Sequence, residues 1–177
     1  MRTFGPTVIH KAVNIRSETP ADEAAISALI TAAFLEAEHS GGNEARIVET
    51  LREAGSLTVS LVATENDMIV GHVAFSPVTI DGRSEGWFGL GPVAVVPDRQ
   101  RDGIGSALIQ AGLTQLRVQG STGCVVLGEP AYYRRFGFTA DPKLRLAGVP
   151  ADYFQRLMFK EEPFGGLVEY HPAFDAA

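Results

Sequence analysis

The stretch VAVVPDRQRDGIGSALI, residues 93–109, constrains the fold more than any other feature of this sequence. An apolar run enters a turn with glycines at 103 and 105, and an apolar-patterned helix is predicted over 104–119. The next apolar run, CVVL at 124–127, has the length and composition of a buried strand. A strand, a helix and a strand at this spacing predict a right-handed parallel crossover.

Hydrophobic patterns on both sides of this unit predict further helices and strands. Three strand-like runs precede the glycine turn, and the polar turns ENDM and DGRSEG between them are typical of hairpins, so we expect an antiparallel meander. The expected elements are a strand at 8–16, helices at 17–34 and 45–54, strands at 56–64, 68–80 and 86–96, a short helix within 130–138, and late strands at 156–160 and 166–171. We therefore expect one α/β domain over residues 1–177, with a mixed, mostly antiparallel sheet, a central strand-helix-strand crossover and flanking helices.

Composition argues against several classes of function. A formal net charge of −6 argues against a nucleic-acid surface, because phosphate binding needs clustered Lys and Arg. The one cysteine, Cys124, excludes an internal disulfide framework and is expected to be a small buried hydrophobic residue. The four histidines are scattered, so no metal site is expected; they are His10, His39, His72 and His171. No signal-peptide or membrane-spanning pattern occurs, which predicts a cytoplasmic protein without a membrane partner.

The glycine turn is suited to binding an anion. The first turn of a helix has unpaired amides and a partial positive charge, and glycine lets a phosphate approach the backbone closely. An ATPase-type loop would need a Gly-Lys-Ser/Thr ending, and a dinucleotide fingerprint would need a third small residue where Leu108 stands. A third pattern, Gln/Arg-x-x-Gly-x-Gly/Ala after a meander, is matched by Gln100, Gly103 and Gly105.

An aromatic motif follows the next strand at the distance that the third pattern leads us to expect. Tyr133, Phe136, Gly137 and Phe138 match Tyr-x-x-Phe/Leu-Gly-Phe. With both markers in order, the sequence over about residues 8–140 resembles the GCN5-related N-acetyltransferases (GNAT). The segment GEPAYYRRFGF is similar to that of a bacterial subgroup of predicted acetyltransferases.

The resemblance implies that acetyl-coenzyme A is the co-substrate. In this family the glycine turn binds the pyrophosphate, the preceding strand hydrogen-bonds the pantetheine arm, and the sheet splays open to admit that arm. Side chains of Arg99, Arg101, Arg134 or Arg135 either add attraction to phosphate or are ordinary surface charges. The expected cofactor-binding residues are Val93, Ala94, Val95, Gln100, Arg101, Asp102, Gly103, Ile104, Gly105 and Ser106.

The resemblance also places Tyr133 beside the cofactor sulfur, where its phenol is the candidate acid for the departing thiolate. Tyr132 is expected to point elsewhere and to pack. The candidate catalytic base is Glu129, with a helix-start acid as the alternative interpretation. His72 is a second candidate, and a chain of water molecules needs neither residue.

The expected function is transfer of an acetyl group from acetyl-coenzyme A to a primary amine by direct attack. The acceptor is either a small molecule or a protein amine, and the sequence leaves both open. The alternatives are a non-catalytic acyl-coenzyme A binding module and, third, a dinucleotide-dependent oxidoreductase. The C-terminal YHPAF either contributes to a homodimer contact or ends the sheet.

Overall fold

The computed structural model describes residues 12–38 and 40–175. Its helices are α1 (Glu23–Phe34), α2 (Glu44–Glu53), α3 (Ile104–Val118) and α4 (Pro130–Tyr133), with short 3-10 helices at Pro20–Asp22, Pro97–Arg99, Arg134–Phe136, Ala151–Tyr153 and Pro172–Phe174. Its strands are β1 (Asn14–Ser17), β2 (Val59–Glu65), β3 (Met68–Pro77), β4 (Thr79–Ile80), β5 (Trp87–Val95), β6 (Gly123–Leu127), β7 (Thr139–Ala140), β8 (Leu144–Arg145), β9 (Phe154–Met158) and β10 (Gly166–Glu169).

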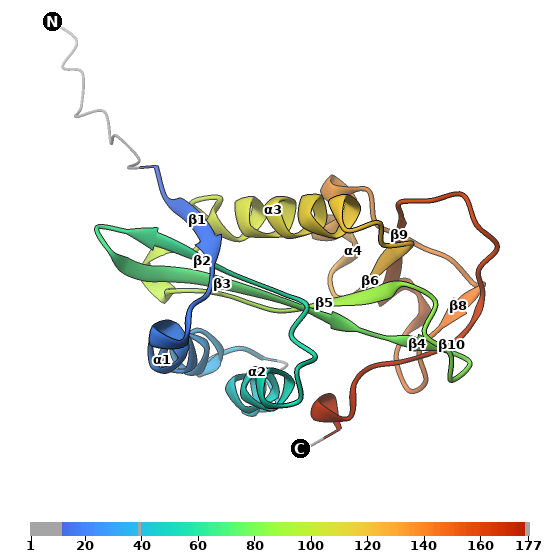
Figure 1. Cartoon of the computed structure of the whole chain (residues 1–177), viewed down its shortest axis with the longest axis horizontal. Helices are drawn as coiled ribbons and strands as arrows, with labels where there is room; N and C mark the ends of the chain where they lie inside the picture. The colour runs from blue at the N-terminus through green and yellow to red at the C-terminus, as the bar shows by residue number, and fades with distance from the viewer. Residues whose placement is uncertain (1–11, 39, 176–177) are drawn as a thin grey trace, which may run out of the picture.

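A seven-stranded mixed sheet is the centre of the structure, in the order β1-β2-β3-β5-β6-β9-β7. The predicted meander is β2, β3 and β5, and the turn between the first two is the hairpin at Asn66 and Asp67, both with positive φ. The predicted crossover is also present, because β5 and β6 pair in parallel around α3. Figure 1 shows α3 along one face of the sheet and α1 and α2 along the other. The expected strand at 8–16 begins outside the described residues, and its described part is β1.

The expected strand over 68–80 is wrong at its end. The chain leaves the large sheet after Pro77, and Thr79 and Ile80 form β4 in a separate three-stranded sheet, β4-β10-β8. The physical reason is the later partner, since β10 lies antiparallel to β4 and pairs Val168 with Ile80. The late strand predicted at 166–171 therefore belongs to this small sheet, whereas the one at 156–160 is β9 of the large sheet.

Within the expected helical segment 17–34, Thr19 is the N-cap and Pro20 lies in the first turn, as its residue type predicts, but this first turn is a 3-10 helix. Its start is set by Asp22, whose carboxylate accepts a hydrogen bond from the amide of Thr19 at 2.7 Å and from Arg16 Nη1 at 2.7 Å. The Arg16 guanidinium and the Thr19 amide hold the pKa of the Asp22 carboxyl well below its usual range. This capping arrangement produces a 3-10 turn first and α1 only from Glu23.

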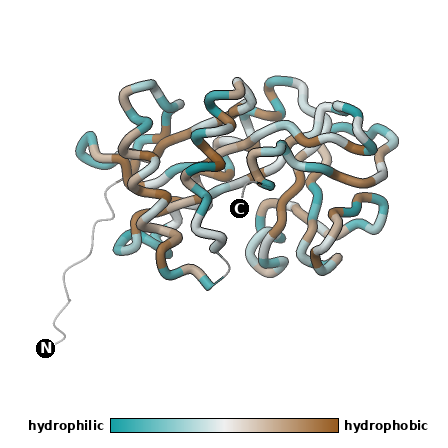
Figure 2. The backbone as a smooth tube through the Cα atoms, turned by 90° about the horizontal axis from the view of Figure 1, so that it is seen from below, coloured by the Kyte–Doolittle hydropathy of each residue, from teal (hydrophilic) through white to brown (hydrophobic). Residues whose placement is uncertain are grey.

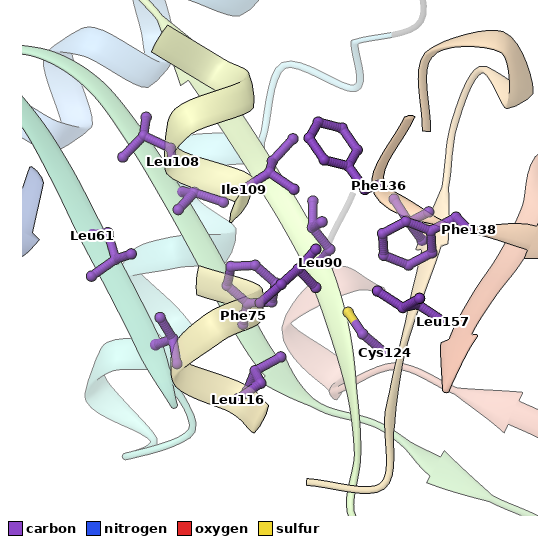
Figure 3. Close-up of a cluster of buried hydrophobic side chains, with 14 of the residues drawn as sticks. Leu61, Phe75, Leu90, Leu108, Ile109, Leu116, Cys124, Phe136, Phe138 and Leu157 are labelled. Atoms are coloured by element: carbon purple, nitrogen blue, oxygen red, sulfur yellow. The ribbon is translucent and has the colours of Figure 1, made fainter. Parts of the chain in front are cut away.

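The main hydrophobic core lies between α3 and the sheet, as Figure 3 shows for Phe75, Leu108 and Ile109, all fully buried. Helix α3 comes close to the sheet at Gly112, because a Cβ there would overlap the ring of Phe75. Figure 2 shows the hydrophobic stretches running through the interior strands and the hydrophilic ones at the turns. Cys124 is fully buried in this core, as predicted, and burial raises the pKa of its thiol.

The large sheet opens between its two parallel strands. β5 and β6 pair only from Trp87–Gly123 to Gly89–Val125, so the rest of β5 has no partner on that side. β5 also bulges between Leu90 and Val93, where its register with β3 shifts. The second half of β5 therefore has no strand partner on the side of β6, as the splay that the resemblance implies requires.

No helix in residues 12–38 and 40–175 combines the length and the apolar character needed to cross a membrane.

Candidate active site

The glycine turn connects β5 to α3 through two residues in the left-handed region. Arg101 has a φ of 69° and Gly103, the residue before the helix, a φ of 82°. The first bond of α3 runs from the amide of Ala107 to the carbonyl of Gly103 at 3.0 Å, so the amides of 104–106 precede the helical ladder. With the helix dipole behind them, these amides form a site suited to a phosphate group.

Gly105 lies where the turn meets β5 and α4. A Cβ at this position would be 3.6 Å from the Tyr132 hydroxyl, 3.7 Å from Val95 Cγ2 and 3.9 Å from Val93 Cγ1. The Tyr132 hydroxyl is also 3.4 Å from Ser106 Oγ. The turn, the free half of β5 and the aromatic motif are thus parts of one continuous surface.

The arginine side chains around the turn differ in whether a carboxylate already neutralises their charge. Arg99 is paired with Glu65 and, through its Nε, with Asp102 at 2.9 Å, so two carboxylates already neutralise it. Arg135 is fixed beside the turn, because its guanidinium stacks 4.3 Å over the ring of Tyr132 and its Nε donates to the Tyr132 carbonyl at 3.0 Å. Arg135 is therefore held against a residue that touches the turn, whereas the Arg101 side chain belongs to the turn itself; both arginines are exposed.

The Gln100 side chain is turned back towards the end of β5. Its Nε2 donates to the carbonyl of Val95 at 3.2 Å. This bond ties the start of the turn to the strand, so Gln100 shapes the turn through its side chain.

A large cleft of about 1120 Å³ adjoins the far end of the free half of β5. One wall comes from α1 and α2, another from the bulge of β5, and a third from the tail of the chain. It is lined by Phe34, Glu44, Ile47, Pro77, Thr79, Leu90, Gly91, Pro92, Val93, Leu127, Tyr133, Leu146, Ala147, Leu167, Val168, Glu169, Tyr170, His171, Pro172, Phe174 and Asp175.

Tyr133 lies at the junction of this cleft and the β5 opening. Its ring is edge-on to Tyr132, with centroids 5.0 Å apart, and packs against Gly128 on the other side. Burial raises the pKa of Tyr133 to about 12, with smaller contributions from Tyr132 and Cys124. The phenol therefore stays protonated at neutral pH, as a proton donor must.

The two candidate bases do not line the cleft. Glu129 is exposed, and its carboxylate accepts a hydrogen bond from the amide of Ala131 at 3.4 Å. Glu129 is thus the N-cap of α4, in agreement with the alternative interpretation of this residue as an acid at a helix start. His72 is fully buried on the α1/α2 face of the sheet, where its Nε2 lies 2.8 Å from Ser60 Oγ. Within the described parts of the chain, no three His, Cys, Asp or Glu side chains are grouped as metal ligands.

The buried state of His72 predicts a loss of stability in mild acid. Burial lowers its pKa to about 4, against about 6.5 in an unfolded chain, so between these values the unfolded state binds more protons than the folded state. The contribution, roughly 3 kcal/mol, is complete above pH 6.5 and is lost as the pH falls towards 4.

Urea unfolding of the protein and of His72→Gln from pH 7 to pH 4 measures this loss. As the pH is lowered, we expect the free energy of unfolding to fall more steeply in the parent protein than in the variant. At pH 5 the difference in slope should correspond to close to one additional proton bound on unfolding. Parallel pH dependences would show that His72 does not titrate in this way.

The tail contributes cleft residues that the sequence reasoning missed. His171 begins the last 3-10 helix, and its Nδ1 accepts from the amide of Ala173 at 3.0 Å. The tautomer that fits this bond has its ring proton on Nε2, and His171 is one of the residues that line the cleft. Glu44, Glu169 and Asp175 were also missed, and only the aromatic cluster YHPAF hinted that the tail is buried against other elements.

Comparison with known proteins agrees with this geometry. The family model described as "Acetyltransferase (GNAT) domain" matches residues 14–140. The uncharacterized N-acetyltransferase YhbS of Escherichia coli K12 is 37% identical over an alignment of 168 residues that covers 91% of this chain and 98% of YhbS.

Solved structures agree in fold over nearly the whole chain. A GNAT family acetyltransferase from Brucella melitensis in complex with acetyl-CoA is 49% identical, with a TM-score of 0.84 over 94% of this chain and 100% of that one. Escherichia coli YhbS in complex with CoA is 35% identical, with a TM-score of 0.86 over 98% and 96% of the two chains. The chain therefore belongs to the GNAT family of acetyltransferases.

Proposed function

We propose that this protein transfers the acetyl group of acetyl-coenzyme A to a primary amine by direct attack. The observation that carries the proposal is the continuous path from the glycine turn, along the free half of β5, to the cleft at Tyr133. An anion site, an extended strand with free main-chain groups and a protonated phenol follow one another in the order of diphosphate, pantetheine and thioester. The two relatives whose structures contain acetyl-CoA and CoA support the same ligand.

The donor side of the reaction is assigned to the strand and the turn. Main-chain groups of Val93 and Val95 on the open side of β5 bind the pantetheine arm, whereas the main chain of Ala94 faces His72 of β3. The segment from Gln100 to Ser106 binds the diphosphate through its amides. The guanidinium of Arg135 adds a positive charge beside this segment. An amide of the same strand stabilises the oxyanion that develops when the amine attacks the thioester carbonyl.

Tyr133 is assigned as the acid. As the carbon–sulfur bond breaks, its phenol donates a proton to the departing sulfur. The amine must lose a proton in the same process, and we assign that proton to water in the cleft, because Glu129 caps α4 and His72 is buried on another face of the sheet.

The charges that line the cleft favour a cationic acceptor. Glu44, Glu169 and Asp175 line it, and the described lining residues include no Lys or Arg. Apolar side chains from α1, β5 and the tail form the remaining walls. An amine with an apolar body and a second positive charge fits these walls better than an anionic one.

Two measurements test the proposed function. Titration calorimetry is expected to show binding of acetyl-coenzyme A and no binding of NADH, which is the control for the dinucleotide alternative. Release of the coenzyme A thiol is then followed with amines of matched size that carry a second positive charge, no charge or a carboxylate. We expect turnover to be fastest with the first group.

Each result has a distinct meaning. Binding of acetyl-coenzyme A without turnover of any amine would favour the non-catalytic binding module. Failure to bind it, or binding of NADH instead, would contradict the assignment of the glycine turn. Equal turnover of anionic and dicationic amines would contradict the role given to the three carboxylates.

A further inference from the structure

Tyr170 has a buried hydroxyl that the fold does not use. It follows β10 in the tail, and its oxygen is shielded from solvent and has no hydrogen-bond partner among the described residues. Other atoms of the same side chain line the cleft. A buried hydroxyl without a partner destabilises the folded state, so a phenylalanine would fit the folded protein better.

The ring of Tyr170 lies at the point where the large sheet opens. A Cβ on Gly89 would be 2.5 Å from Tyr170 Cε1, and Gly89 is the last residue of β5 that pairs with β6. On the other side the ring packs against Phe174, with centroids 5.1 Å apart. The absence of a side chain at Gly89 is thus what gives Tyr170 its place in the opening.

Tyr170 lines the same cleft as Tyr133, the residue that we assign as the acid. Burial raises the pKa of Tyr170, so its phenol stays protonated at neutral pH. Tyr170 is therefore a hydrogen-bond donor in the wall of the cleft in which we place the thioester.

We propose that the Tyr170 hydroxyl donates a hydrogen bond to the carbonyl oxygen of the bound acetyl thioester. The inference rests on the proposed function, since it needs the thioester at the end of β5. It makes Tyr170 a second substrate-binding hydroxyl, supplied by the tail, that distinguishes the acetylated cofactor from the free thiol. The same bond strengthens as the carbonyl oxygen gains negative charge during attack.

The test is Tyr170→Phe, with calorimetric titration of acetyl-coenzyme A and of coenzyme A. Coenzyme A has no acyl carbonyl, so its affinity is expected to stay within about twofold, while the affinity for acetyl-coenzyme A falls roughly 3- to 10-fold, the range of one hydrogen bond. The melting temperature of the free variant is expected to equal or exceed that of the parent, because an unpaired buried hydroxyl has been removed. Tyr153→Phe, at a tyrosine that is 43% exposed and does not line the cleft, is the matched control and should change neither affinity.

Other outcomes would overturn the inference. Equal weakening of both ligands together with a lower melting temperature would indicate that Tyr170 only supports the fold. Unchanged affinity for both would show that its hydroxyl does not touch the thioester, while leaving the proposed function in place. If the parent protein bound neither ligand, the proposed function would fail first and the inference with it.

Discussion

Gly105→Glu is expected to weaken the binding of acetyl-coenzyme A on the order of 100-fold. The new side chain would start 3.6 Å from the Tyr132 hydroxyl and carry a carboxylate into the mouth of the turn, where we place the diphosphate. Two charges about 5 Å apart at an effective dielectric constant of about 20 repel by roughly 3 kcal/mol, which corresponds to about two powers of ten in affinity. Titration calorimetry of the purified variant measures the loss.

Gly105→Ala is the control for the space that the side chain occupies. Its Cβ would make only ordinary contacts, at 3.6–3.9 Å, so the folded protein accommodates it and we expect less than a tenfold loss of affinity. Circular dichroism checks that α3 is retained in both variants. If the glutamate variant bound as tightly as the parent, the diphosphate would have to lie elsewhere.

Tyr133→Phe is expected to lower kcat about 100-fold while KM for acetyl-coenzyme A changes little. Loss of a general acid costs typically two to four powers of ten in rate, and removal of a group that acts only in the transition state leaves ground-state binding intact. Because burial raises the pKa of Tyr133 to about 12, ionisation of this residue should not reduce the rate of the parent enzyme below about pH 11. Rates measured from pH 6 to 10.5, with chemistry as the slow step, test both statements.

Binding of acetyl-coenzyme A to Tyr133→Phe serves as the internal control for its fold. An unchanged dissociation constant with a reduced rate would support the acid role. A full rate across this pH range would remove Tyr133 from the mechanism and leave protonation of the thiolate to water.

The sequence predicts the strand, the turn and the helix to which we assign the acyl donor, because the determinants of these elements are local. The two glycines, the apolar run before them and the apolar face of α3 lie within residues 93–118, and each acts on its immediate neighbours. The hairpin at Asn66 and Asp67 is predictable for the same reason.

The cleft that we assign to the acceptor cannot be predicted from the sequence, because it is formed by contacts between residues far apart in the chain. β4 and β8 have two residues each and become strands only because β10 pairs with both. Glu44 and Glu169 are far apart in the chain and share the cleft only through this tertiary arrangement. His72 shows the opposite problem, since its residue type suggests chemistry and only the fold shows that it is enclosed.

The small second sheet belongs to a later part of the chain than the surfaces assigned to the acyl donor. Residues 87–138 hold the surfaces assigned to the acyl donor, whereas the tail wall of the cleft comes from residues after 144 and is anchored mainly through β10. Under the proposed function, substitutions in the tail are therefore expected to alter the choice of amine without disturbing the donor site. Tyr170 connects the two regions, because this residue of the tail wall lies against Gly89 of β5, the strand to which we assign the donor.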